Sequence, residues 1–247
     1  MTSFDKYSEI FTHRARELFE KEDLKNNPEY RETLLNRLLG LSGPKRISRN
    51  MTPFDVFFSK LFAGFNEIYS SYYSLLDIEV YLRRFPYPNT KISKTRYLAY
   101  HMENYLNEVY ILKERLSSYC TVVGRLYRND QTVKDLKGAV RDLSGIVQKS
   151  LKGITNTRDI HVHSSRFTDE DLDRLSSIEL INRGPNEIPP LKTVYKVAFR
   201  NTRKKYGVAI KRNNEEIRKI LDAYFEVLYA VVANRKGGVR YPRLKTA

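Results

Sequence analysis

The stretch TRYLAYHMENYLNEVYILKERL, residues 95–116, decides the fold class of this chain. Its large apolar residues alternate spacings of four and three, which places them on one side of an α-helix. The opposite side carries acidic and amide groups suited to solvent. The residues of the apolar side are Leu98, Met102, Tyr105, Val109, Leu112 and Leu116.

Comparable apolar stripes lie before and after this segment. They predict long helices over residues 52–81, 133–151 and 213–234. Thr52 with Pro53 is typical of a helix start, and Gly153 is typical of a helix end. Four long amphipathic helices are the parts of an up-and-down helical bundle. We therefore predict an all-α protein.

The sequence also predicts flanking segments around the bundle. Apolar residues at helical spacing over 4–19 and 34–39 indicate two short helices, and residues 42–51 have the composition of a loop. The end of the chain is basic and contains two consecutive glycines. We expect an N-terminal helical extension at 1–50, the bundle at 51–234 and a flexible basic tail at 235–247.

Composition limits the compartment and the class of protein. Cys120 is the single cysteine of the chain, which excludes an internal disulfide and a four-cysteine zinc site and indicates a reducing compartment. The sequence shows no signal-peptide core and no apolar run long enough to cross a bilayer. We expect a cytoplasmic protein that has no membrane partner.

The formal net charge of +15 predicts a polyanionic partner. Charge that only aids solubility is the alternative. Residues 188–214 contain no acid, and Tyr195, Phe199 and Tyr206 lie among their cations. This pattern favours a surface that follows phosphates and stacks bases, although it also fits a solvated helix face. The predicted nucleic-acid-binding residues are Lys192, Lys196, Arg200, Arg203, Lys204, Lys205, Lys211 and Arg212.

A separate segment, TRDIHVHSS at residues 157–165, has the residue types that cleave RNA. Histidine transfers protons near neutral pH, and arginine is a permanent phosphate ligand. RNA cleavage requires a base for the 2′-hydroxyl, an acid for the leaving oxygen and a cation near phosphorus. Five residues of helix would separate Arg158 and His163 by about 140°, so we expect either that this segment is irregular or that the pair acts across two chains.

Arg158-Asp159-Ile160-His161-Val162-His163 resembles the signature of the HEPN superfamily, helical-bundle proteins of which many are metal-independent ribonucleases. The likeness covers roughly residues 52–234. It implies that Arg158 binds the scissile phosphate, that His163 transfers protons or positions the nucleophile, and that Asp159 orients its neighbours. His161 belongs to the same candidate catalytic site. The resemblance also implies a homodimer in which two motifs meet across a two-fold axis.

Other interpretations of these residues stay open. Arg96 and His101 repeat the spacing inside the helix of 95–116, where we interpret them as a surface or groove-facing pair. If the later segment is extended, Asp159, His161 and His163 project from one side and form part of a divalent-metal site with Asp169 or Asp171. The histidines could instead only stabilise the loop by hydrogen bonds.

The leading prediction is a metal-independent endoribonuclease of HEPN type, without a cofactor, of the toxin or host-defence kind. Its partners would be RNA or another nucleic acid and a restraining antitoxin or regulatory protein. The first alternative is a non-catalytic helical module that binds nucleic acid or protein. A second is a regulatory protein recognised through its N-terminal helices. The sequence contains no phosphate-binding Walker loop, dinucleotide-binding glycine pattern, nucleophile elbow or zinc-protease helix.

Overall fold

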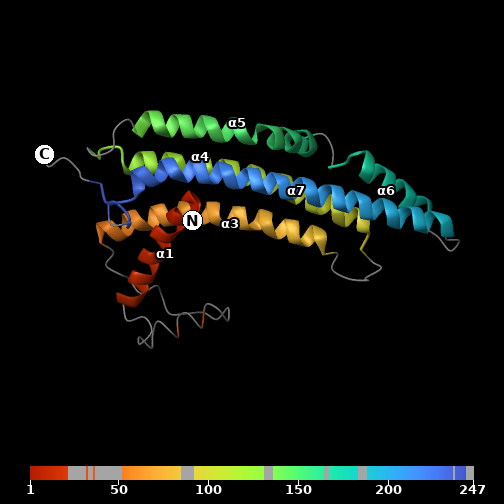
Figure 1. The fold of residues 1–247 in the computed structure, drawn as a ribbon. Coiled ribbons are helices and arrows are strands. Elements are labelled where there is room, and N and C mark those ends of the chain that lie inside the picture. Colours follow the sequence, from red (N-terminus) through yellow and green to blue (C-terminus); the bar gives the residue numbers. More distant parts are fainter. Residues whose placement is uncertain are drawn as a thin grey trace. The chain divides into compact units, whose positions relative to one another are not determined.

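A computed structural model of the chain confirms an all-α helical bundle (Figure 1). It describes residues 1–21, 32, 36, 52–84, 92–130, 136–163, 167–182, 188–235 and 237–242. No helix within these ranges has the long, nearly uncharged apolar run that crossing a membrane requires. The helices with defined bounds are α1 (Ser3–Lys21), α3 (Pro53–Arg83), α4 (Lys94–Leu126), α5 (Leu136–His163), α6 (Glu170–Ile181) and α7 (Pro189–Val232).

The apolar stripe of residues 95–116 lies in the core, as the sequence predicts. All six of its residues are at most 9% exposed. The same spacing continues through Tyr119 and Val123, which are buried as well, so that α4 extends to Leu126. Burial of one continuous stripe holds this helix together over its whole length.

Helices α5 and α7 also extend beyond the ranges that their sequence patterns predict. Helix α5 does not end at Gly153. One glycine weakens a helix by only about 1 kcal/mol relative to alanine, which is too little to end it. A Cβ atom at position 153 would meet no neighbouring atom within 4 Å. Helix α7 begins at Pro189 rather than near Asn213. Proline is favoured in the first turn of a helix. The cations that follow Pro189 interrupt the apolar stripe of the buried face, so the sequence pattern does not reveal this part of the helix. Of the helix predicted over 34–39, only residue 36 lies within the described residues.

The chain divides into two compact units, of which unit 1 comprises residues 1–63, 121–139 and 221–247. Helix α1 contributes to the core of this unit. Phe4, Tyr7 and Phe11 are at most 1% exposed. The ring centroids of Tyr7 and Phe225 lie 4.6 Å apart, and the backbone N–H of Phe4 donates to the carboxylate of Asp222 at 3.1 Å. Unit 1 therefore contains residues on both sides of the boundary predicted at residue 50.

Part of the predicted flexible tail packs in unit 1. Val239 pairs with Ala233 in an antiparallel bridge, and the hydroxyl of Tyr127 donates to the carbonyl oxygen of Arg240 at 2.7 Å. The ring of Tyr241 contacts Phe57 edge-on at 5.2 Å between centroids. Residues 239–241 of the predicted tail therefore pack in unit 1, while residues 243–247 lie outside the described residues.

Unit 2 comprises residues 64–120 and 140–220 and contains both segments that the sequence marks for function. The buried amide of Asn214 on α7 joins two other helices. It donates to Glu79 of α3 at 3.0 Å and accepts from the hydroxyl of Tyr105 of α4 at 3.1 Å. Gly64 allows α3 to approach α4 closely, because a Cβ atom there would lie 2.5 Å from the Cδ2 atom of Tyr119.

Candidate nucleic-acid interface

The basic segment predicted to bind nucleic acid forms the first half of α7. It has an outer face rich in exposed cations and an inner face that packs in unit 2. Of the eight predicted cations, Arg203 is half-buried. The others are exposed: Lys192, Lys196, Arg200, Lys204, Lys205, Lys211 and Arg212.

The aromatic residues of this segment point inward, contrary to the prediction that they stack bases. Phe199 is 8% exposed and Tyr206 is 3% exposed. Tyr195 is half-buried, and its hydroxyl oxygen lies 3.1 Å from that of Thr95 on α4. The three rings therefore belong to the inner, apolar face of α7. The outer face of α7 is cationic and exposes none of these three rings.

A groove of about 450 Å³ follows the outer face of α7 where the end of α3 approaches it. None of the described residues that line it is acidic. Two small residues, Gly207 and Val208, complete the lining, so that long cationic side chains surround an open floor. We call this surface the basic groove. Its cations are Arg83, Arg200, Arg203, Lys204 and Lys211.

Arg83 is the member of the basic groove that sequence reasoning missed. It lies at the end of α3, more than a hundred residues before the predicted segment, and its guanidinium pairs with Glu79 at 2.5 Å. In the sequence, the Arg83-Arg84 doublet beside the predicted helix end is the only local feature that points to this cation. Such a doublet also fits cations that favour the negative end of any helix, so it does not by itself indicate a site.

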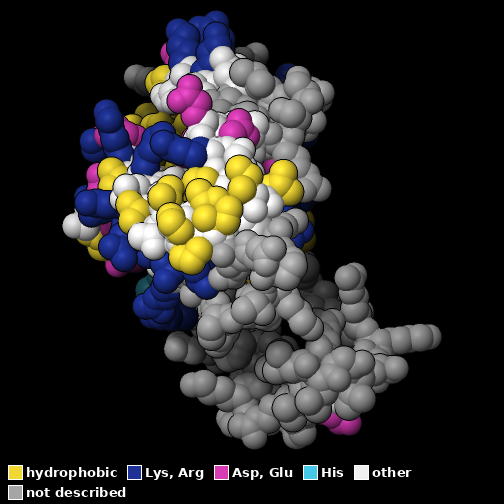
Figure 2. Space-filling view, turned by 90° about the vertical axis from the view of Figure 1, so that its right-hand side faces the viewer, with side chains coloured by type: hydrophobic (Ala, Val, Ile, Leu, Met, Phe, Trp, Pro, Cys, Tyr) yellow, Lys and Arg dark blue, Asp and Glu magenta, His cyan; other side chains and the backbone are white. Residues whose placement is uncertain are grey.

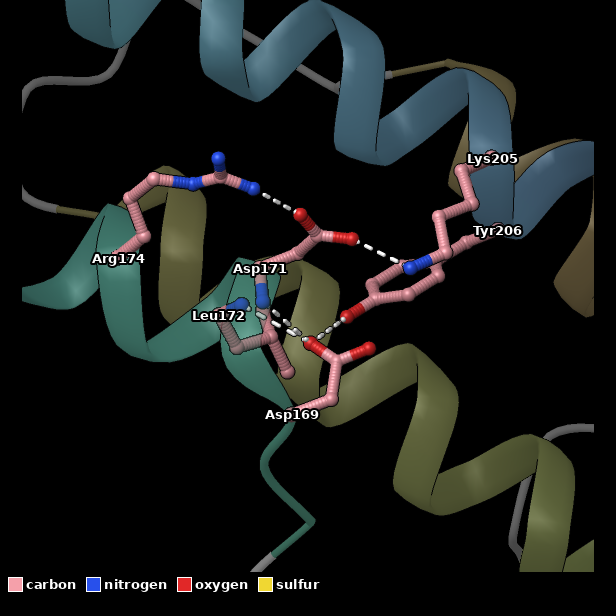
Figure 3. Close-up of polar contacts among 6 residues, drawn as sticks. All are labelled: Asp169, Asp171, Leu172, Arg174, Lys205 and Tyr206. Atoms are coloured by element: carbon pink, nitrogen blue, oxygen red, sulfur yellow. Dashed lines mark hydrogen bonds and ion pairs between the residues drawn. The ribbon is translucent and has the colours of Figure 1, made fainter.

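Lys205, another of the eight predicted cations, contacts a different helix of unit 2. Its ammonium group lies 2.5 Å from Asp171 of α6, which also accepts a hydrogen bond from Arg174 (Figure 3). The hydrogen bond with Lys205 is the main reason that the pKa of Asp171 is lowered, and the same contact raises the pKa of Lys205. Lys205 therefore joins α7 to α6 and does not line the basic groove.

A cluster of aromatic rings lies where α3 ends and α4 begins. His101 is 9% exposed, and the rings of Tyr97, Tyr100 and Tyr81 lie 4.4, 5.4 and 5.9 Å from it. Burial raises the pKa of Tyr97, and the positive charge of Arg203 opposes that rise. The charge of Arg203 in the basic groove therefore acts on Tyr97 of this cluster. His101 is buried here, which corrects its interpretation as a surface residue.

The RDIHVH motif lies in the last turns of α5 and not in an irregular segment. Thr155, just before it, is buried, and its hydroxyl donates to the carbonyl oxygen of Leu151 at 3.1 Å as in a regular helix. Helical geometry places positions 158 and 163 about 140° apart around the axis. The side chains of Arg158, Asp159, His161 and His163 lie outside the described residues.

The helical backbone also removes the geometry that the metal-site alternative requires. Asp159, His161 and His163 would share one side of an extended strand, whereas α5 is helical across all three positions. Asp169 caps α6 by accepting from the backbone N–H groups of Asp171 and Leu172, and Asp171 is paired with Lys205 (Figure 3). Within the described residues, no three acidic, histidine or cysteine side chains form a metal-binding group.

The basic groove is thus a well-defined candidate site within the described part of the chain, and the RDIHVH motif stays a candidate on its sequence. No family model matches the sequence, and neither a curated protein nor a solved structure gives a significant match to the chain.

Proposed function

We propose that this protein binds RNA by contacting consecutive phosphates with the basic groove. The observation that carries the proposal is a groove in which five cationic side chains are lining residues and no described lining residue is acidic. Lys and Arg that neutralise phosphates release condensed counterions, which provides affinity without sequence recognition. The excess of basic over acidic residues in the whole chain, +15 in formal charge, adds long-range attraction.

The dimensions of the groove favour a polyanion over a single small anion. Arg200, Lys204 and Lys211 lie within about 40° of one another around α7 and extend about 16 Å along its axis. One phosphate group could contact only part of such a row. A strand of nucleic acid would place several phosphates along it.

The test removes three groove cations together. The variant Arg200→Gln/Lys204→Gln/Lys211→Gln should bind a single-stranded RNA about 100-fold more weakly at 0.1 M salt, because about 0.7 counterions are released per phosphate contact. The slope of log K against log salt should become shallower by about 2. Fluorescence anisotropy with a labelled RNA of 20 nucleotides or so, measured across a salt series, checks both values.

Helix α5 offers a matched control for this variant. Arg141, Lys149 and Lys152 are also exposed cations of unit 2, and Arg141 has an ion pair with Asp142 as Lys211 has with Glu215. The variant Arg141→Gln/Lys149→Gln/Lys152→Gln carries the same change in net charge. Equal losses of affinity in the two variants would show that only the overall charge attracts RNA and would overturn the groove as the site.

Cleavage of the bound RNA is the second proposed activity, and the HEPN resemblance of Arg158 and His163 supports it. Because these positions face different directions on one helix, a shared phosphate requires Arg158 of one chain and His163 of another. We expect cleavage of RNA in EDTA that Arg158→Ala and His163→Ala each abolish. Mixing the two inactive variants should restore about a quarter of the wild-type rate, since half the dimers then hold one complete site.

The cleavage assay of the wild type and the single variants separates binding from catalysis. A wild-type protein that binds RNA through the groove but releases no fragments would contradict the nuclease and leave RNA binding in place. Activity that both single variants retain would assign any cleavage to another site or to a contaminant.

A further inference from the structure

Hydrophobic side chains gather on the surface where α6 ends and α7 begins. Figure 2 shows this end of unit 2, with the hydrophobic side chains in one patch and Lys and Arg side chains beside it. Leu180 and Ile181 of α6 are 68% and 62% exposed, and Val194 and Val197 of α7 are each 51% exposed. Contiguous exposed apolar surface of this kind indicates a binding surface.

The patch includes a groove between α6 and α7. This groove has a volume of about 620 Å³ and is lined mainly by small side chains of α7. On the other side it is bounded by Asp171 and Arg174 of α6. Small side chains let another backbone approach closely, so the shape of the groove suits the binding of a helix. Its small lining residues are Thr193, Val194, Val197, Ala198 and Thr202.

The charges beside the groove favour an acidic occupant. Arg200 and Lys204 lie within about 60° of Val197 around α7, and both are exposed. At the α6 side, the charge of Asp171 is balanced by Arg174 and Lys205. A second copy of this chain would bring cations against cations, which disfavours self-association at this surface.

We propose that this patch binds an amphipathic helix of a partner protein, with an aliphatic stripe bordered by Asp and Glu. The aliphatic stripe would enter the groove between α6 and α7, as in other helix-in-groove complexes. The acidic residues would face Arg200 and Lys204. The proposal does not rest on RNA binding, because the apolar groove itself is lined by other residues than the basic groove; only Arg200 and Lys204, which lie beside it, belong to the basic groove as well.

The test uses a display library of random 16-residue peptides selected on the full-length protein. Binders are counter-selected against Val194→Asp/Val197→Asp, which places acids in the groove. We expect enriched peptides to carry aliphatic residues at helical spacing with flanking Asp or Glu. In fluorescence anisotropy, these peptides should bind the patch variant at least tenfold more weakly than the wild type.

Ile146→Asp/Val227→Asp is the matched control, because both residues are exposed aliphatics outside the patch. It has the same net charge as the patch variant and should keep wild-type affinity. Equal weakening in both variants, or enrichment of acidic peptides without an aliphatic pattern, would overturn the proposal in favour of charge attraction alone. Circular dichroism of the patch variant verifies that it is folded.

Two other occupants have their own signatures. If the patch variant abolishes co-sedimentation with phosphatidylserine vesicles while no helical peptide pattern emerges, the surface binds lipid and the proposal fails. If the wild type forms a dimer in analytical ultracentrifugation that the patch variant loses, the occupant is a second copy and the proposal also fails.

Discussion

At His101, burial opposes protonation. Its Nδ1 atom is buried without a hydrogen-bond partner among the described residues, and burial lowers its pKa below the usual value of 6.5. The unfolded chain therefore binds the proton more tightly than the folded chain does. The neutral imidazole contributes stability that is complete above pH 6.5 and is lost as the pH falls through 6.5 toward the lowered pKa.

Replacing this histidine should flatten the acid side of the stability profile. We expect the free energy of unfolding of the wild type to fall more between pH 7.5 and pH 5 than that of His101→Phe, which keeps a ring beside Tyr97. Urea denaturation at a series of pH values measures the difference. His13→Gln is the control, since the His13 side chain is 77% exposed on α1. Parallel profiles for wild type and His101→Phe would contradict the effect of burial.

On the scale of one element, the stability of α6 depends on the hydrogen bonds of its N-cap residue, Asp169. Asp169 accepts hydrogen bonds from the N–H groups of Asp171 and Leu172 and from the hydroxyl of Tyr206 at 2.7 Å (Figure 3). Asp169→Ala removes the cap and leaves the Tyr206 hydroxyl without this partner. The two effects together should destabilise α6 by about 2–4 kcal/mol.

Hydrogen exchange across residues 170–181 measures this loss directly. Asp169→Asn keeps a side-chain oxygen at the cap and should lose much less protection than Asp169→Ala. Glu170→Ala, which removes an exposed acid from the same turn, serves as the control. Normal exchange of α6 in Asp169→Ala would mean that packing of Leu172 and Leu175 alone holds the helix.

The existence of the elements could be predicted better than their ends. The stripe of α4 is regular, so its burial follows from spacing alone. Between residues 189 and 212 of α7, eight cations interrupt the apolar pattern, and only the burial of Phe199 and Tyr206 shows that they belong to the inner face. Helix α5 continues past Gly153 because buried Thr155 extends its packing, which local glycine and histidine signals do not reveal.

On the scale of the whole molecule, charge and fold class follow from composition and periodicity, whereas the sites depend on tertiary contacts. The basic groove requires Arg83 of α3 to lie beside Arg200 and Lys211 of α7. No local pattern predicts a contact between residues so distant in sequence. The apolar patch likewise arises where α6 and α7 approach, and its members separately look like ordinary helix residues.

The close approach of α3 to α4 at Gly64 has a consequence for the evolution of the chain. A larger residue at position 64 would collide with the ring of Tyr119. Among homologous sequences, glycine at one position and a large aromatic residue at the other should therefore be inherited together, and any lineage that acquires a methyl group at 64 should show a compensating reduction at 119.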